Sequence, residues 1–241
     1  DSYAQQLMDN YGDAYTANGI GLETLKLYQQ LQYKHTLLLD LIYGKDGETP
    51  VDDADLTEHL DSQMYELAYV NIPLYNTSTF VFASDDQKAE MLQLAQQAAT
   101  AANLMDYENV EDQVSALHAA AQSALPDIYA VLDATPSDDA SSVQTELLTE
   151  SDLTSTFTQD GAADAVRGLV YGEAAAVQYN GYSVILMMRI DPLQVSTLDA
   201  LRSQILSDMK GEELNDALAA YGAQLDSTLS SSAMSKLPAA K

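Results

Sequence analysis

Three histidines, His35, His59 and His118, are the side chains of this chain best suited to acid–base or metal chemistry near neutral pH. Each lies in a segment whose apolar spacing predicts a helix. None is followed by a second histidine four residues later, which is the spacing of a zinc-binding helix. Cysteine is absent, which excludes thiol nucleophiles, thiolate metal sites and disulfides. We therefore interpret the histidines as ordinary helical residues.

Motifs of the common enzyme classes are missing from the sequence. It contains no P-loop, no G-x-G-x-x-G, no G-x-S-x-G and no H-E-x-x-H. An acidic group, Asp52, Asp53 and Asp55, lacks the alternating ligands, central glycine and distal glutamate of a calcium loop. Carboxylates at a helix start also stabilise its free amides and its dipole, so we favour capping here. We expect no metal and no cofactor.

The charge of the chain restricts its partners. Its 241 residues include 37 Asp and Glu against 10 Lys and Arg, a net charge of -27. A field of this sign repels phosphate backbones and anionic lipid headgroups, which excludes nucleic acid as a partner. The hydrophobic content of 46% predicts a folded chain, and no run of about 18 apolar residues is present to span a membrane.

Both ends of the chain are predicted to be helical. Leucines and tyrosines recur at helical spacing from Leu22 to Ile42, and a short helix carries Leu56, Leu60 and Met64 on one side. Near the C-terminus the same pattern runs from Leu198 to Leu229, as one helix or as two helices separated at Gly211.

The middle of the chain has a mixed pattern. Residues 66–82 are rich in β-branched and aromatic residues, which favours strand and turn. Residues 84–132 predict two alanine-rich helices, the second kinked or ended by Pro126. A short helix is expected over 162–169, followed by strands 175–179 and 182–189. Asn180-Gly181 between these strands predicts a type I′ hairpin turn.

This order predicts an α+β fold in which both chain ends form a helical domain and a sheet domain is inserted between them. We place the N-terminal helical part at residues 1–66 and the sheet domain at residues 67–191. Residues 192–241 then complete the helical domain.

Residues 162–190, AADAVRGLVYGEAAAVQYNGYSVILMMRI, resemble the C-terminal half of a parvulin-type peptidyl-prolyl isomerase domain. In that family a short helix leads through a Gly-Glu turn into a strand, a hairpin and a final strand. The matching positions are Asp164, Ala165, Leu169, Gly172, Glu173, Val177, Gly181 and Tyr182. Upstream, Ala68–Leu74 resembles the first strand of the family and Gln87–Ala98 the helix after it.

With its helical ends, the chain is similar to the PrsA and SurA class of extracytoplasmic foldases. Gly19–Lys26 and Val51–Leu56 resemble the helix starts of that class. The resemblance implies a helical chaperone lobe built from both chain ends. It also implies an inserted parvulin-like antiparallel sheet domain that is flanked by helices.

The resemblance also implies a site. The family's two catalytic histidines correspond to Asn71 and Ser183, and Tyr182 opens the final strand as a substrate-binding residue. The proline pocket of the family is lined by a Met and a Phe four residues apart. A gapped alignment places this pair at Leu153 and Phe157. An ungapped alignment gives Thr158 and Ala162, which offer no pocket, and the middle strand offers only Glu146 at the family's acidic or cysteine position.

Isomerisation requires the X-Pro amide to twist, helped by an apolar pocket and hydrogen-bond donors, and needs no covalent step. Asn71 and Ser183 can still form hydrogen bonds, but both family histidines are replaced. We therefore expect an extracytoplasmic folding factor with weak or no isomerase activity. An active peptidyl-prolyl isomerase and a surface binding protein that uses the same fold for a dedicated partner are the alternatives.

The expected partners are unfolded or secreted polypeptides. The expected location is the surface of a bacterium, as a lipoprotein whose only membrane contact is an N-terminal lipid anchor upstream of Asp1.

Overall fold

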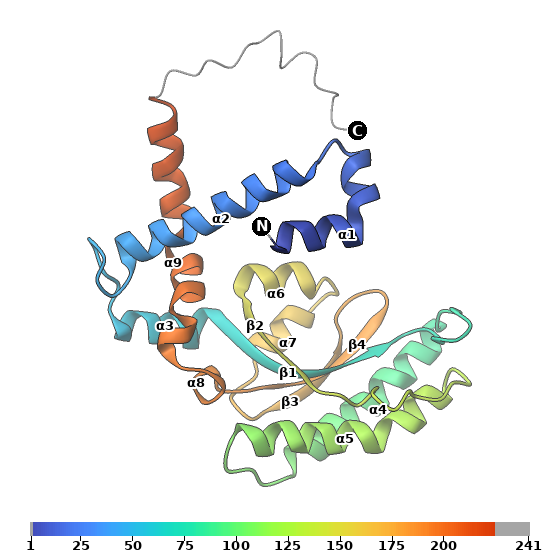
Figure 1. Cartoon of the computed structure of the whole chain (residues 1–241). Coiled ribbons are helices and arrows are strands. Elements are labelled where there is room, and N and C mark those ends of the chain that lie inside the picture. Colours follow the sequence, from blue (N-terminus) through green and yellow to red (C-terminus); the bar gives the residue numbers. More distant parts are fainter. Residues whose placement is uncertain (1, 225–241) are drawn as a thin grey trace. The chain divides into compact units, whose positions relative to one another are not determined.

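The computed structural model describes residues 2–224 (Figure 1). Within this range it contains nine helices and a four-stranded antiparallel sheet, so the predicted α+β class is confirmed. The chain divides into two compact units. The terminal unit comprises residues up to Asp52 together with those from Arg202 on, and the central unit is Asp53–Leu201.

The terminal unit is helical. It contains α1 (Ser2–Ala17), α2 (Leu22–Tyr43) and most of α9 (Leu198–Gly222), and α1 contacts α2. The predicted helix from Leu22 ends as expected at Gly44, whose N–H donates to the carbonyl of Asp40. α9 continues through Gly211 as one helix. The predicted continuation through Leu225 and Leu229 lies outside the described residues.

The central unit begins with α3 (Asp53–Gln63), which runs directly into β1 (Met64–Pro73) and packs against it. This unit therefore starts before the predicted domain boundary at residue 67. Asp53 and Asp55 lie in the first turn of α3, where their negative charge favours the helix dipole.

The sheet has the strand order β2-β1-β4-β3, with every neighbouring pair antiparallel. The other strands are β2 (Gln144–Thr149), β3 (Ala174–Gln178) and β4 (Ser183–Arg189). The two central strands, β1 and β4, are largely buried, which explains their long apolar runs.

Helices cover both faces of the sheet (Figure 1). On one face lie α4 (Asp85–Asn103) and α5 (Val110–Ala130), and on the other lie the shorter α6 (Glu150–Thr156) and α7 (Ala162–Arg167). Pro126 does not end α5, which continues to Ala130. The predicted pair of helices between residues 84 and 132 is otherwise confirmed.

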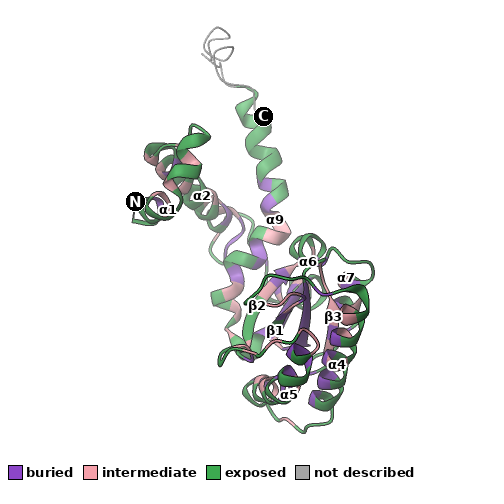
Figure 2. Cartoon of the chain, turned by 90° about the vertical axis from the view of Figure 1, so that its right-hand side faces the viewer, coloured by how far each residue is buried: buried purple, intermediate pink, exposed green. Residues whose placement is uncertain are grey.

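Two cores result, because alternate side chains of a strand point to opposite faces. The larger core lies against α4 and α5, and the smaller one lies against α6 and α7. Figure 2 shows the buried residues of the central unit along the strands and on the sides of the helices that face them. The larger core includes Val70, Ile72, Val184, Leu186, Met91 and Leu117. The smaller core includes Tyr65, Leu67, Ile185, Met187, Leu153, Phe157 and Val166.

The hairpin between β3 and β4 is present, but the predicted type I′ turn is wrong. Neither Asn180 nor Gly181 has a positive φ, which that turn requires at both positions. Instead Oδ1 of Asn180 accepts a hydrogen bond from the N–H of Tyr182 at 2.8 Å, and the N–H of Tyr179 donates to the carbonyl of Ser183 at 3.3 Å. The Asn180 side chain thus closes a wider loop.

Candidate functional site

The two positions that the resemblance assigns to catalysis, Asn71 and Ser183, share one face of the sheet. Asn71 pairs with Ile185 across β1 and β4, and Ser183 pairs with Pro73. Paired residues share a face, as do residues two apart on one strand. Asn71 is exposed, whereas Ser183 is only 8% exposed. The face they share is the one that α6 and α7 cover.

The apolar pair predicted to bind a proline ring lies inside the smaller core. Leu153 is completely buried and Phe157 is 4% exposed. The ring of Tyr179 packs on Phe157, with centroids 5.5 Å apart. In this arrangement neither apolar side chain offers its surface to a substrate. Of the alternative pair, Thr158 is exposed and Ala162 is buried.

Tyrosine hydroxyls provide the hydrogen bonds around these positions. Tyr179 donates to Oδ1 of Asn71 at 3.2 Å, and Tyr69 donates to Oε1 of Gln144 at 3.1 Å. Burial raises the pKa of Tyr69, and the nearby Glu146 carboxylate raises it further. Tyr69 therefore stays protonated at neutral pH. The arrangement can orient a polar group by hydrogen bonding, but it brings together no nucleophile and base.

The histidines lie in helices, as predicted. His35 is in α2, His59 is in α3 and His118 is in α5. The Nδ1 atom of His118 is 2.8 Å from the carbonyl oxygen of Ser141, which fixes this ring against a loop.

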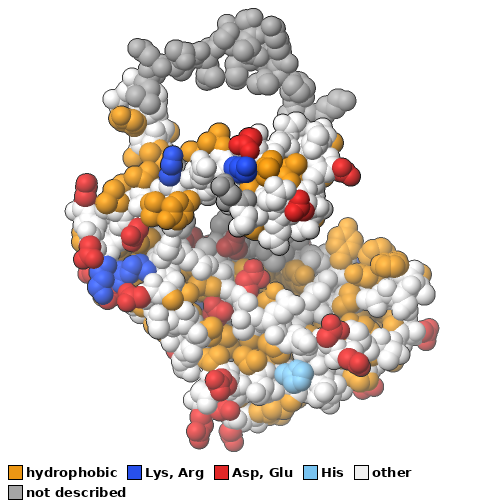
Figure 3. Space-filling view, in the orientation of Figure 1, with side chains coloured by type: hydrophobic (Ala, Val, Ile, Leu, Met, Phe, Trp, Pro, Cys, Tyr) orange, Lys and Arg blue, Asp and Glu red, His pale blue; other side chains and the backbone are white. Residues whose placement is uncertain are grey.

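A group of exposed aromatic side chains lies at the neighbouring end of the sheet. We call it the aromatic surface, and it consists of the exposed Phe80, Val81, Phe82 and Tyr182 together with the half-buried Tyr75. Phe80 is 73% exposed, Phe82 is 57% exposed and Tyr182 is 62% exposed. Figure 3 shows hydrophobic side chains gathered over the β1–α4 and β3–β4 loops, at the right of the view. Apolar groups that are both clustered and exposed mark interaction sites.

The rings of the aromatic surface contact one another across two loops. The Tyr75 centroid lies 6.3 Å from that of Phe80 and 5.6 Å from that of Phe82. Phe82 in turn packs against Tyr182, 5.8 Å away. Such spacings are typical of favourable aromatic pairs. The sequence predicted a role for Tyr182 alone. The signal for the others was the apolar run Phe80–Phe82 between two polar stretches.

Asn76 holds the β1–α4 loop in its conformation. Its Oδ1 accepts from the N–H groups of Ser78 and Thr79, at 3.0 and 3.1 Å. Its Nδ2 donates to the carbonyl of Leu132 at 3.0 Å, which ties the loop to the end of α5. Phe80 has a φ of +56°, a left-handed conformation that costs a bulky residue on the order of 1–3 kcal/mol. The loop thus holds an exposed ring in a strained conformation.

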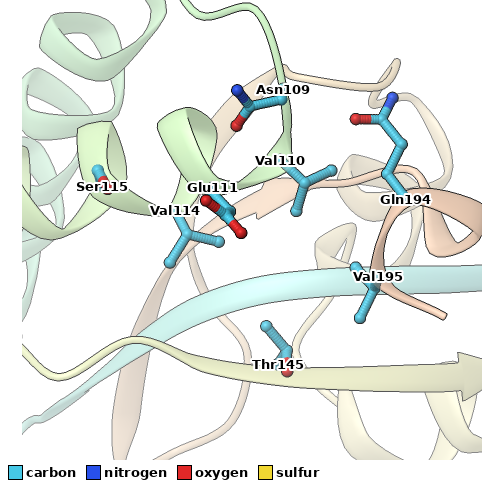
Figure 4. A pocket seen from close by; sticks show the side chains of 8 residues that line it. All are labelled: Asn109, Val110, Glu111, Val114, Ser115, Thr145, Gln194 and Val195. Atoms are coloured by element: carbon cyan, nitrogen blue, oxygen red, sulfur yellow. The ribbon is translucent and has the colours of Figure 1, made fainter.

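A separate cavity of about 760 Å³ lies between the start of α5, β2 and α8 (Pro192–Val195), as Figure 4 shows. Val110, Val114 and Val195 give its lining an apolar part, and Glu111 is the one charged side chain among the eight lining residues. Oδ1 of Asn109 is already bonded to the N–H of Asp112, 2.9 Å away. The lining offers no catalytic pair.

Glu66 is a buried carboxyl group that the sequence analysis did not identify. It lies in β1, is 6% exposed, and points to the opposite face from Asn71 because the two positions differ by an odd number. Burial raises the pKa of Glu66 to about 7, and the charge of Glu146 adds to the shift. The sequence signal for this buried carboxyl group was a glutamate within the apolar run of β1.

Comparison of the chain with family models, with curated proteins and with solved structures finds no match. Between residues 2 and 224, no helix combines the length and apolar composition needed to cross a bilayer. The same range holds no group of three His, Asp or Glu side chains arranged to bind a metal ion. Function is therefore inferred from the geometry of the chain itself.

Proposed function

We propose that this protein is a folding factor that binds unfolded or secreted polypeptides outside the cytoplasm, in the manner of the PrsA and SurA class, with weak or no isomerase activity. The observation that carries the proposal is the aromatic surface. Three of its four rings are exposed, the rings contact one another, and a hydrogen-bonded loop holds them. Aromatic rings give large contact areas with few rotatable bonds, which suits binding to varied chains.

The order of elements supports the parvulin-like part of this proposal. α7 is followed by a turn at Gly172, by β3, by a hairpin and by β4, as the resemblance predicts. Gly172 has a φ of +83°, which favours glycine at this turn. Tyr182 of the aromatic surface directly precedes Ser183, which stands at the position of the second family histidine.

The surroundings of Asn71 support weak catalysis at most. Rotation about an X-Pro bond faces a barrier of about 18–20 kcal/mol, and lowering it requires an apolar pocket beside hydrogen-bond donors. Here the Tyr179 hydroxyl is already hydrogen-bonded to the Asn71 side chain, and the Tyr179 ring covers Phe157. An active isomerase is the second candidate, because Asn71 and Ser183 retain hydrogen-bonding groups on one face.

Two assays on the whole protein test the proposal. In the first, a chemically unfolded client is diluted with and without the protein, and aggregation is followed by light scattering. In the second, the cis-to-trans rate of a proline tetrapeptide is measured. We expect suppressed aggregation and little or no acceleration of the peptide. Strong acceleration would favour the isomerase, and unchanged aggregation would contradict the chaperone role.

A pair of variants locates the binding surface. Phe82→Ser removes a ring from the aromatic surface, and Leu104→Ser removes an even more exposed apolar side chain at the far end of α4. We expect Phe82→Ser to weaken the suppression of aggregation at least threefold and Leu104→Ser to leave it unchanged. Equal effects of the two variants would show that binding occurs elsewhere.

A further inference from the structure

The central unit carries almost no positive charge. Residues 53–201 contain 24 Asp and Glu but only three cations, Lys88, Arg167 and Arg189. Lys88 pairs with Asp85 at 3.3 Å, and Arg167 pairs with Glu150 and Asp164. Each of these two cations is therefore already bound to a carboxylate of this unit.

Arg189 is also engaged within the unit. Its guanidinium lies over the rings of Tyr65 and Tyr171, 5.0 and 5.1 Å from their centroids. It donates hydrogen bonds to the carbonyls of Leu169 and Asp61, each at 3.0 Å. Three cations against 24 carboxylates leave the central unit with a large negative charge, and all three cations are already engaged by groups of this unit.

Carboxylates flank the aromatic surface from two segments. Asp85 and Asp86 form the first turn of α4, three residues after Phe82 in the chain. Asp133 directly follows Leu132, whose carbonyl holds the loop through Asn76. In the same region, burial raises the pKa of the Tyr129 hydroxyl, and both Tyr75 and Asp139 raise it further.

We propose that the aromatic surface selects cationic polypeptide segments, in which Lys or Arg alternates with bulky apolar side chains. This inference rests on the proposed function, because it names the class of client bound at the same surface. The apolar side chains of such a segment would pack on Phe80, Phe82 and Tyr182. Its cations would meet the carboxylates of Asp86 and Asp133 and the faces of the exposed rings, and would compete with Lys88 for the fully exposed carboxylate of Asp85.

Other partners fit this surface less well. Nucleic acids and anionic vesicles would bring negative charge to a unit that already carries 24 carboxylates. Acidic peptides would meet the same repulsion. Neutral apolar peptides would use the rings but gain nothing from the carboxylates.

The test uses three 15-residue peptides with the same Phe, Leu and Val content, whose remaining positions are Lys, Gln or Glu. Their affinities for the whole protein are measured by fluorescence anisotropy at 50 and 300 mM NaCl. We expect the Lys peptide to bind about tenfold more tightly than the Gln peptide at low salt, and the Glu peptide to bind most weakly. The advantage should shrink severalfold at high salt, because exposed charges are screened.

Two triple variants show whether the preference is local. Asp85→Asn, Asp86→Asn and Asp133→Asn together remove the carboxylates that flank the rings. Asp106→Asn, Glu108→Gln and Glu111→Gln remove the same charge at the opposite end of the α4–α5 pair, where these residues are exposed. We expect only the first variant to lose most of the preference for the Lys peptide. An equal loss in both variants would overturn the localised selection.

The outcomes separate the two proposals. If the Lys and Gln peptides bind equally well and both bind less well to Phe82→Ser, the cationic preference is wrong and the chaperone surface stands. If none of the three peptides binds the wild-type protein at either salt concentration, the proposed function fails with it. If a triple variant is too unstable to use, the wild type alone still tests the cationic preference. The preference is wrong if the Lys peptide has no advantage over the Gln peptide at 50 mM NaCl.

Discussion

The hydroxyl of Tyr179, at the end of β3, donates a hydrogen bond to Oδ1 of Asn71 on β1, 3.2 Å away, across the intervening strand β4. The ring of the same tyrosine packs against Phe157, with centroids 5.5 Å apart. One side chain therefore engages the polar position on β1 and at the same time covers Phe157 at the C-terminal end of α6.

Replacing Tyr179 separates these two roles. Tyr179→Ala should lower the free energy of unfolding by about 1–3 kcal/mol, because Phe157 loses its cover. Tyr179→Phe keeps the ring and loses only the hydrogen bond, at a cost of about 0.5–1.5 kcal/mol. Urea unfolding measures both values. A loss in Tyr179→Phe as large as that in Tyr179→Ala would mean that the hydroxyl, and not the ring, is the main contact.

Glu66 should make the protein less stable as the pH rises through neutrality. Its pKa in the folded protein is raised to about 7 from an ordinary value of 4.5, mainly by burial. Between these two pH values the folded state holds a proton that the unfolded state has released, so stability falls as the pH increases. Below pH 4.5 the group is protonated in both states and contributes no such slope.

Glu66→Gln tests this effect. At pH 8.5 the variant should be about 1–3 kcal/mol more stable than the wild type, since the buried charge is gone. At pH 5.5 the difference should be much smaller. Glu58→Gln, at an exposed position of α3, removes the same charge and should show no such pH-dependent gain. Equal gains at the two pH values would contradict the assigned titration.

Gly172 should not tolerate a side chain. Its φ is +83°, and an added Cβ would lie 3.1 Å from both Gln113 and the ring of Tyr107. Gly172→Ala should therefore cost about 1–3 kcal/mol of stability, measured as a lower melting temperature. Gly181→Ala is the matched control, because that position has open space and no positive φ, and it should change stability by less than about 0.5 kcal/mol.

Arg189 should be replaceable by lysine only at a clear cost. Its planar guanidinium faces two tyrosine rings and bonds two separate carbonyls, a combination that an ammonium group cannot reproduce. Arg189→Lys should lower the free energy of unfolding by about 1–3 kcal/mol. Arg167 is more exposed and forms surface ion pairs with Glu150 and Asp164. Arg167→Lys should therefore lower the free energy of unfolding by less than about 1 kcal/mol. A reversed order in urea unfolding would contradict these roles.

Local patterns predicted most elements, because helical and strand spacing of apolar residues reflects the face each element buries. Thus α2, the α4–α5 pair and the β3–β4 hairpin follow from the sequence. The conformation of the turn at Asn180 does not follow from the sequence. There the Asn180 side chain accepts the hydrogen bond of the Tyr182 N–H, and the backbone does not form a type I′ turn. The burial of Glu66 was not predicted either, although a glutamate inside the apolar run of β1 was a signal for it.

The candidate site was predicted only in part. Asn71 and Ser183 were placed by a resemblance, and the structure puts them on one face of neighbouring strands. The cover that Tyr179 forms over Phe157 depends on a contact between distant segments, which no local pattern encodes. The exposure of Phe80 and Phe82 could not be predicted for the same reason. An apolar run indicates a binding surface only when no distant segment packs over it.

The position of β1 in the sheet has a consequence for folding. β1 is an inner strand whose partner β4 comes more than a hundred residues later in the chain, so its pairing closes a very long loop. Contacts of this kind form late and slow the folding of a domain, whereas α4 and α5 are neighbours in sequence and can pair early. During synthesis from the N-terminus, the apolar β1 thus emerges long before β4 exists. A chain that stops before Ser183 would keep this strand without its main partner, so the central unit can complete its sheet only after its last strand has been made.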